Sequence, residues 1–336
     1  MRDSVTGLKI RLSNERYCGD TIFDALKQQQ KLNNLHFDSD KSLLQNDILG
    51  SFLLPLCSGI NGERLRNGQK VFQTYPTEVM TILGLYSLPY CYAAAKGAGV
   101  LVLSKYLLEN PDKRLMETGE FICKVNAPEA FEERGDGVIS ILKVRLMHAS
   151  VRLMAMKTIK NEIPINQEDL LGTLLSFSLI VVRGLRLMGI KLPETQTEDY
   201  LYMWNIIGQI MGVKEDLIPT NIRECTLIER CIRERQFKKS GDGMKLVNSL
   251  VKSISQNWPV KAVKPESLIA AFVGEEVSKC LGINASYNSR QIAINALKTI
   301  NFFQSKGAYN ANSKMLLKDL QNGFFDGSFG EYMIAS

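Results

Sequence analysis

Residues 166–190, NQEDLLGTLLSFSLIVVRGLRLMGI, decide the fold class. Asn166 and Asp169 form an approximate capping box at the start of this stretch. Leucine, isoleucine, valine and phenylalanine then occupy nearly every helical face between residues 170 and 182. Gly189, with Pro193 shortly after it, is typical of a helix end. The pattern predicts one long helix over residues 166–188, buried on all sides at the centre of the fold.

Outward from this stretch, most of the ten prolines lie where an apolar pattern of three- and four-residue spacing begins or ends. Asn110 is a predicted N-cap, with Pro111 at the first helical position. We therefore predict an all-α protein with no sheet of three or more strands. The other predicted helices span residues 111–125, 137–160, 197–211, 265–282, 289–303 and 313–322.

Composition narrows the class of protein. The chain has 336 residues, of which 45% are apolar and 23% charged, as in soluble globular proteins. Its 41 basic and 35 acidic residues give a net charge of +6, spread too thinly for a nucleic-acid-binding face. Residues 223–239 are rich in arginine, but interleaved glutamates predict an ion-paired, solvated helix. We expect no nucleic-acid partner.

No transmembrane segment and no secretory signal are expected. Residues 79–95 form an uncharged apolar stretch that Pro89 interrupts, at or below the length of a membrane-spanning helix, and predict a buried helix pair. Seven scattered cysteines without a CxxC motif favour reduced thiols and a cytoplasmic location. We divide the chain into an N-terminal extension (1–50), a helical domain (51–305) and a C-terminal helix and tail (306–336).

Histidine occurs only at positions 36 and 148, which excludes a metal centre built from several histidines. In the segment KVRLMHASVRLMAMK, residues 143–157, Arg145, His148 and Arg152 share one helical face. One interpretation is a hydrogen-bonded core histidine, with the arginines paired to acids such as Glu168 or Asp169. The other is a haem site, in which His148 binds the iron and the arginines lie near the propionates.

The preceding helix carries a second candidate group in KRLMETGEF. Arg114 and Thr118 lie one turn apart with Glu117 beside them, which suits either an oxygen-binding pair or a surface ion pair. Gly172, Gly184 and Gly208 lie inside predicted helices, where they indicate close helix crossings or room for a flat macrocycle. No Walker A or GxSxG motif is present, which disfavours nucleotide and serine-hydrolase chemistry.

Six segments in this order resemble the helical family of latex-clearing rubber oxygenases and the endoplasmic-reticulum oxygenase of mycophenolic acid synthesis. The resemblance covers about residues 75–285, and VRLMHASVR is its most specific part. The segments are SLPYCYAAAKGAGVLVLS, KRLMETGEFICKV, VRLMHASVR, the central stretch quoted above, YLYMWNIIGQIMGV and LIAAFVGEEVSKCLGI.

The resemblance implies a single helical domain with a globin-like core that holds one haem b. His148 corresponds to the proximal iron ligand, and Arg114 and Thr118 correspond to the distal side. The family's Arg-x-x-Lys-Thr becomes Arg114 followed by Glu117 and Thr118, and KGAG stands at residues 96–99 where an acidic base is expected. These departures make polyisoprene cleavage doubtful.

The expected function is a haem-dependent oxygenase that activates dioxygen on an apolar small-molecule substrate. Arg114, Glu117 and Thr118 are the candidate catalytic residues. His148, Arg145 and Arg152 are the candidate haem-binding residues, with the arginines holding propionates or buttressing the ligand helix. Two alternatives stay open: a carrier or sensor that binds haem or a lipid-like ligand without turnover, and a haem-free helical interaction protein.

Overall fold

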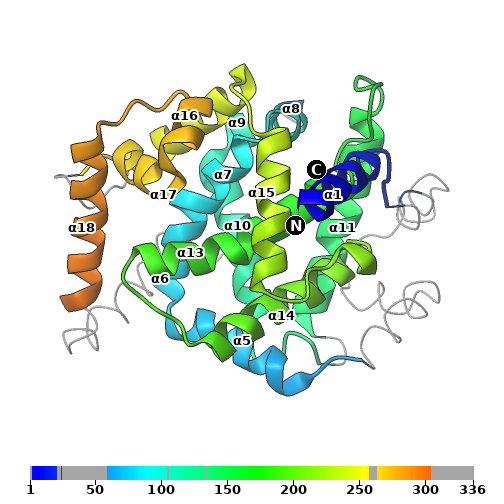
Figure 1. Ribbon diagram of the computed structural model, residues 1–336, viewed down its shortest axis with the longest axis horizontal. Coiled ribbons are helices and arrows are strands. Elements are labelled where there is room, and N and C mark those ends of the chain that lie inside the picture. Colours follow the sequence, from blue (N-terminus) through cyan, green and yellow to red (C-terminus); the bar gives the residue numbers. More distant parts are fainter. Residues whose placement is uncertain are drawn as a thin grey trace.

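The computed structural model describes residues 2–20, 24, 59–103, 106–132, 135–256 and 263–303. Helices make up every regular element in these ranges, and the only β-type pairing there is an isolated bridge between Ala94 and Phe237. The all-α prediction is therefore confirmed (Figure 1). The helices are α1 Arg2–Glu15, α5 Gly62–Thr74, α6 Pro76–Ile82, the π-helix η1 Leu83–Ser87, α7 Leu88–Tyr92, α8 Ala95–Leu103, α9 Tyr106–Glu109, α10 Pro111–Asn126, α11 Asp136–Ala155, α12 Gln167–Phe177, α13 Leu179–Leu187, α14 Glu194–Ile210, the 3₁₀ turn η2 Glu215–Leu217, α15 Ile222–Gln236, α16 Gly241–Gln256, α17 Pro265–Cys280 and α18 Tyr287–Phe303.

Local capping signals fix several of the helix ends. The Asn166 side chain accepts from the Asp169 amide, and the Asp169 carboxylate accepts from the Asn166 amide, so the capping box at the start of α12 is complete. Pro111 opens α10 as predicted, although Asn110 makes no side-chain capping bond. Gly189 adopts a left-handed φ of 89° after α13, which suits a residue without a side chain.

The central stretch is two helices rather than the single predicted one. Ser178 has φ −104° and ψ −81° and separates α12 from α13, while its Oγ donates to the Leu174 carbonyl at 2.9 Å. A serine hydroxyl that bonds to the preceding turn bends helices, a local effect that apolar periodicity does not reveal. Burial was predicted correctly, since only Thr173 and Arg186 are exposed between residues 167 and 187.

Residues 76–92 form one continuous helical run rather than the predicted pair of helices. The π-helical turn η1 joins α6 to α7 and immediately precedes Pro89. A proline in a helix lacks an amide hydrogen and crowds the carbonyl four residues earlier, so a wider turn before it accommodates the ring. Tyr86 of η1 and Tyr90 of α7 both lie in the protein interior, nearly inaccessible to solvent.

Two of the three predicted helix-interior glycines mark close crossings. A Cβ on Gly184 would lie 2.6 Å from Ile82, and one on Gly208 would lie 2.5 Å from Leu174. A Cβ on Gly172 would meet Ile232 only at the ordinary distance of 3.4 Å. The close-crossing interpretation is therefore confirmed for Gly184 and Gly208.

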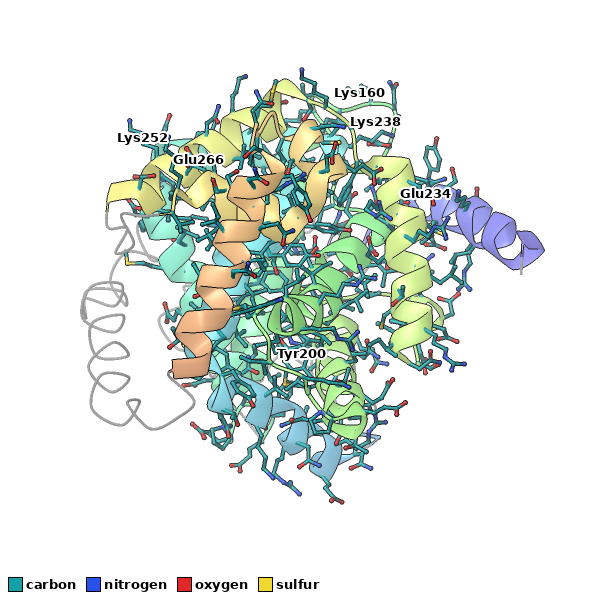
Figure 2. The ribbon with its side chains drawn as sticks, turned by 60° about the vertical axis from the view of Figure 1, so that its left-hand side comes forward. Lys160, Tyr200, Glu234, Lys238, Lys252 and Glu266 are labelled. Atoms are coloured by element: carbon teal, nitrogen blue, oxygen red, sulfur yellow. The ribbon has the colours of Figure 1, made fainter. Side chains whose placement is uncertain are left out.

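The helices surround α12 and α13. In Figure 1, α13 lies near the middle of the view between α6 and α15, both of which it contacts, while α18 and α1 lie at opposite sides. Figure 2 shows Tyr200 inside the molecule and the charged residues Lys160, Lys238, Lys252 and Glu266 on its outside. The N-terminal helix α1 packs against α12 and α15. His36 and the predicted helix 313–322 lie outside the described residues.

One helical stretch, Gln167–Leu187, has the length and apolar character of a membrane span. Of its most apolar 18-residue window, 67% is buried inside the protein. This burial is what a central core helix requires, because helices that are apolar all round occupy the interior of a domain.

Candidate functional site

A cavity of about 720 Å³ lies among the helices. Its walls come mainly from α7, α8, α10, α11, α12, α14, α15 and α16. Most of the lining is apolar, as at Leu101, Phe121, Val151, Phe177 and Ile207. Cofactor and small-molecule pockets in proteins span roughly 300–1,000 Å³. The cavity therefore has the size and chemical character of a site for an apolar organic molecule.

His148 lies in the wall of this cavity on α11. The His148 residue as a whole is half-buried, and its Nδ1 is buried without a hydrogen-bond partner in the part of the chain that the structure describes. The pKa of His148 is lowered to about 3, first by burial and then by the positive charges of Arg152 and Arg114. The ring is therefore neutral at pH 7, the state in which a histidine binds a metal.

The donor set suits a metal that brings most of its own ligands. Among the residues with described positions, no group of three or more His, Cys, Asp or Glu side chains is arranged to hold a bare metal ion. Haem iron needs only an axial donor from the protein, because the macrocycle supplies the equatorial ligands. A neutral imidazole with an unpartnered ring nitrogen, in the wall of an apolar cavity, fits this requirement.

Arg114, Glu117 and Thr118 lie on α10, which packs along α11, and all three line the same cavity as His148. Arg114 Nη1 donates to Glu117 Oε2 at 3.2 Å. Thr118 Oγ1 donates to the Arg114 carbonyl at 2.9 Å. Both partners of the ion pair are partly shielded, with side-chain exposures of 34% for Arg114 and 14% for Glu117. The structure thus brings all the predicted catalytic residues to the cavity that His148 lines.

Arg145 and Arg152 are buried side chains of α11 itself and are not among the residues that line the cavity. Arg145 is ion-paired with Asp20, and Arg152 with Asp24. The predicted pairing of these arginines with Glu168 or Asp169 is wrong, because both of those acids pair with Arg16. Of the two roles predicted for these arginines, the structure favours buttressing of α11.

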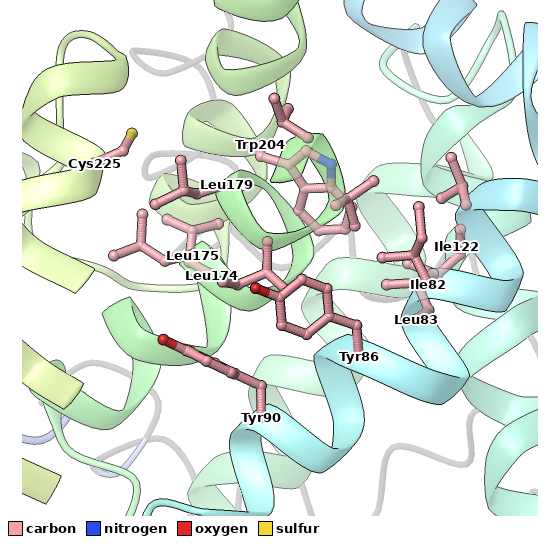
Figure 3. Packing of buried hydrophobic residues seen from close by; sticks show 14 of the residues in the cluster. Ile82, Leu83, Tyr86, Tyr90, Ile122, Leu174, Leu175, Leu179, Trp204 and Cys225 are labelled. Atoms are coloured by element: carbon pink, nitrogen blue, oxygen red, sulfur yellow. The ribbon is translucent and has the colours of Figure 1, made fainter. Parts of the chain in front are cut away.

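Sequence reasoning missed a buried polar cluster in another part of the cavity wall. Glu229 accepts hydrogen bonds from Tyr90, from Arg183 Nη1 at 2.7 Å and from Arg233 Nε at 3.2 Å. Burial and the neighbouring Glu229 charge raise the pKa of Tyr90, so the phenol stays protonated. Figure 3 shows Tyr86 and Tyr90 projecting from one helical run, and their rings meet edge to face at 5.7 Å. Apart from Glu229 and Arg233, which lie one turn apart on the same helix, no spacing in the sequence connects the members of this cluster.

The helix that carries Glu229 was predicted to be solvated, and this was wrong for one of its faces. On α15, an inward stripe is buried against the core, whereas the outer face carries ion pairs such as Arg230–Glu234. The buried stripe consists of Cys225, Ile228, Glu229, Cys231, Ile232 and Gln236. Its isoleucines and cysteines were the available signal, which the charged residues between them obscured.

Comparisons with known proteins agree with this arrangement. The model of the family described as ER-bound oxygenase mpaB/B'/Rubber oxygenase, catalytic domain, matches residues 80–295 of the chain. A curated relative, the rubber oxygenase of Streptomyces sp. (strain K30), is 22% identical over 181 residues, which are 51% of this chain and 44% of the relative. The chain thus matches less than half the length of that relative.

A solved structure shares the overall fold. The structure of latex clearing protein LCP in the closed state superimposes with a TM-score of 0.69. The match covers 92% of this chain and 91% of the other, at 17% sequence identity. The two chains therefore share their helical architecture over nearly their whole lengths.

Proposed function

Since the chain belongs to the family of ER-bound oxygenase mpaB/B' and rubber oxygenase catalytic domains, we propose that it is a haem-dependent oxygenase acting on an apolar small molecule. The observation that supports this most directly is His148, a neutral imidazole with an unpartnered buried nitrogen in the wall of an apolar cavity. Bound haem b would supply the redox-active iron at which dioxygen binds and is activated.

Each protein group has a definable part in this proposal. His148 is the axial donor, and its low pKa keeps it unprotonated throughout the physiological range. Arg114 uses part of its guanidinium for Glu117 and has further N–H groups that can donate to an oxygen atom or a propionate. The Thr118 hydroxyl keeps its acceptor lone pairs while it donates to the helix backbone. The apolar walls exclude water and select an apolar substrate.

The competing proposal is a carrier or sensor that binds haem, or a lipid-like ligand, without turnover. The pairing of Arg114 with Glu117 favours the carrier or sensor. Glu117 is an acid at the position where the resembling rubber oxygenases carry a lysine. KGAG stands at residues 96–99, where an acidic base is expected. The groups expected to move protons in polyisoprene cleavage are therefore replaced, whereas the proximal histidine is retained.

Titration of the purified chain with haemin, followed by absorption spectroscopy, tests both forms of the proposal. A Soret band that saturates at one haemin per chain, and a carbon monoxide complex after reduction, are expected for either form. Absence of a saturable Soret band would refute haem binding and leave a haem-free helical interaction protein. Oxygen consumption by the reduced protein in the presence of an apolar substrate would separate the oxygenase from the carrier.

Polyisoprene serves as the substrate of a second test. We expect the haem-loaded chain to bind carbon monoxide and yet release no aldehyde- or ketone-ended fragments from polyisoprene. Efficient release of such fragments would show that Glu117 and residues 96–99 do not impair the cleavage reaction.

Two properties of the whole chain complete the proposal. We place the oxygenase domain at residues 51–305, between an N-terminal extension (1–50) and a C-terminal segment (306–336). We place the protein in the cytoplasm, where the free thiols of its described cysteines would stay reduced.

A further inference from the structure

Three charged residues at and beyond the end of α1 make ion pairs with distant parts of the chain. We name Arg16, Asp20 and Asp24 the N-terminal clasp. Asp20 pairs with Arg145, Asp24 pairs with Arg152, and Arg16 pairs with acids between α11 and α12 and at the start of α12. The residues joined by the two aspartate pairs are 125 and 128 positions apart in the sequence.

Asp20 holds Arg145 with two hydrogen bonds. The distances are 2.5 Å from Arg145 Nε to Oδ2 and 3.0 Å from Nη2 to Oδ1, and the side chains of both residues are only 4% exposed. Arg145 Nη1 also donates to the Ile210 carbonyl at 2.8 Å. A Cβ on Gly212 would lie 2.8 Å from Arg145 Nε, so the guanidinium fills a space that only glycine leaves open. Arg145 therefore has one well-defined position.

Asp24 holds Arg152 in a comparable way. Arg152 is 1% exposed and, besides its bond to Asp24, donates from Nη2 to the Ile165 carbonyl at 2.9 Å. Ile165 has a left-handed φ of 50°, which is unfavourable for a β-branched residue and needs support from its surroundings. Ile165 also lines the cavity. Arg152 thus connects the clasp to a strained part of the cavity wall.

His148 lies three residues after Arg145 and four before Arg152 on the same helix. A buried guanidinium without an anion is strongly destabilising, so α11 can keep this position only while both arginines have their carboxylates. The clasp is also linked to α8, a helix that contributes to the cavity lining, because Arg16 binds Glu162, which accepts a further bond from Lys96 on α8. The clasp residues therefore bear on two walls of the cavity.

We propose that Asp20 and Asp24 are positioning residues for His148, which neutralise and anchor the two arginines that flank it and thereby fix its place in the cavity wall. This proposal rests on the proposed role of His148 as the axial haem ligand. The segment that follows α1 would therefore be a structural part of the haem site.

The test compares Asp20→Asn and Asp24→Asn with Asp216→Asn. Asp216 is a control because it too pairs with an arginine, Arg11 of α1, but is exposed and absent from the cavity lining. The rate of haem loss to excess apomyoglobin and the reduction potential of the bound haem are measured for each variant. Loss of a group that orients a metal ligand typically costs about 10- to 100-fold in affinity.

We expect about 10- to 100-fold faster haem loss in the Asp20 and Asp24 variants. We also expect a higher reduction potential, because an uncompensated arginine favours the more reduced haem. Asp216→Asn should match the wild type in both measurements. Asp20→Glu keeps the charge and should retain the wild-type potential, a result that a purely structural role for Asp20 would not require.

A measurement without haem separates this proposal from the proposed function. Amide hydrogen exchange in residues 145–152 of the haem-free chain should accelerate in Asp20→Asn and Asp24→Asn but not in Asp216→Asn. If the wild type binds no haem, the proposed function fails, while this exchange pattern still tests the clasp. The clasp is refuted if both variants match Asp216→Asn in exchange and in haem loss. If Asp20→Asn does not fold, Asp24→Asn, whose carboxylate is 19% exposed, provides the milder comparison.

Discussion

Glu229 is a buried carboxylate whose hydrogen bonds come from Tyr90, Arg183 and Arg233. Glu229→Gln would remove the negative charge between two arginines whose side chains are 32% and 27% exposed. We expect the free energy of unfolding to fall by about 2–4 kcal/mol, below the largest losses for fully buried pairs because water screens the arginines partly. Urea denaturation measures the change.

The same substitution at Glu275 provides the control. The Glu275 side chain is 62% exposed and pairs with Lys279 and Arg290 on the surface. Surface ion pairs contribute at most about 1 kcal/mol, so Glu275→Gln should leave the unfolding curve nearly unchanged. Equal effects of the two substitutions would mean that the Glu229 cluster is no more important than a surface pair.

Single residues differed in how far sequence alone could place them. His148 could be found because histidine is scarce and this one lies on an apolar helix between two arginines. The partners of those arginines could not be found, since contacts across 125 residues leave no local spacing. Glu229 was missed because two of its partners, Tyr90 and Arg183, come from other helices, whereas the spacing of the third, Arg233, is also that of a surface ion pair.

At the scale of helices, the crossing of α5 and α14 depends on Gly68. A Cβ there would lie 2.5 Å from the Asp199 carbonyl oxygen and 2.7 Å from the Met203 Cβ. Gly68→Ala should force the two helices apart, and we expect a loss of about 1–3 kcal/mol of unfolding free energy. Thermal and urea unfolding followed by circular dichroism both report this loss.

Gly84 in η1 is the matched position, because a Cβ there would meet no atom within 4 Å. Alanine favours helical conformations over glycine by up to about 1 kcal/mol, so Gly84→Ala should be neutral or stabilising. Destabilisation by Gly84→Ala as large as that by Gly68→Ala would contradict the close approach of α5 and α14.

Helix boundaries were predictable where the responsible residues are neighbours in sequence. The capping box of Asn166 and Asp169, the proline that opens α10 and the glycine after α13 were all read correctly. The break at Ser178 was not, because the apolar pattern continues across it and a single hydroxyl bond decides the geometry. The π-helical turn before Pro89 is another local adjustment that periodicity does not encode.

At the scale of the whole molecule, haem-free protein should lose stability as the pH falls from 7 to 5. The His148 pKa is about 3 in the folded chain and about 6.5 in an unfolded one. Below pH 6.5 the unfolded chain therefore binds a proton that the folded chain does not, and unfolding becomes more favourable. Over this range the loss attributable to His148 is about 2 kcal/mol.

Comparison with a variant separates the contribution of His148 from those of the other titrating groups. Burial raises the pKa values of Asp24 and Asp169, so their uptake of protons on acidification opposes the loss, whereas ion pairs lower the pKa of Glu162. His148→Phe removes only the imidazole contribution, and its unfolding free energy should fall less steeply between pH 7 and 5. Parallel pH profiles for the two proteins would show that His148 is not buried in the neutral form.

The assignment of His148 as the haem ligand is tested most directly by chemical rescue. His148→Gly is reconstituted with haemin, and its absorption spectrum is recorded with and without added imidazole. We predict loss of haem or a shifted ferric spectrum without imidazole, recovery of the wild-type spectrum with it, and no change in His36→Ala. A full complement of haem with an unaltered spectrum in His148→Gly, or loss of haem in His36→Ala, would contradict the account.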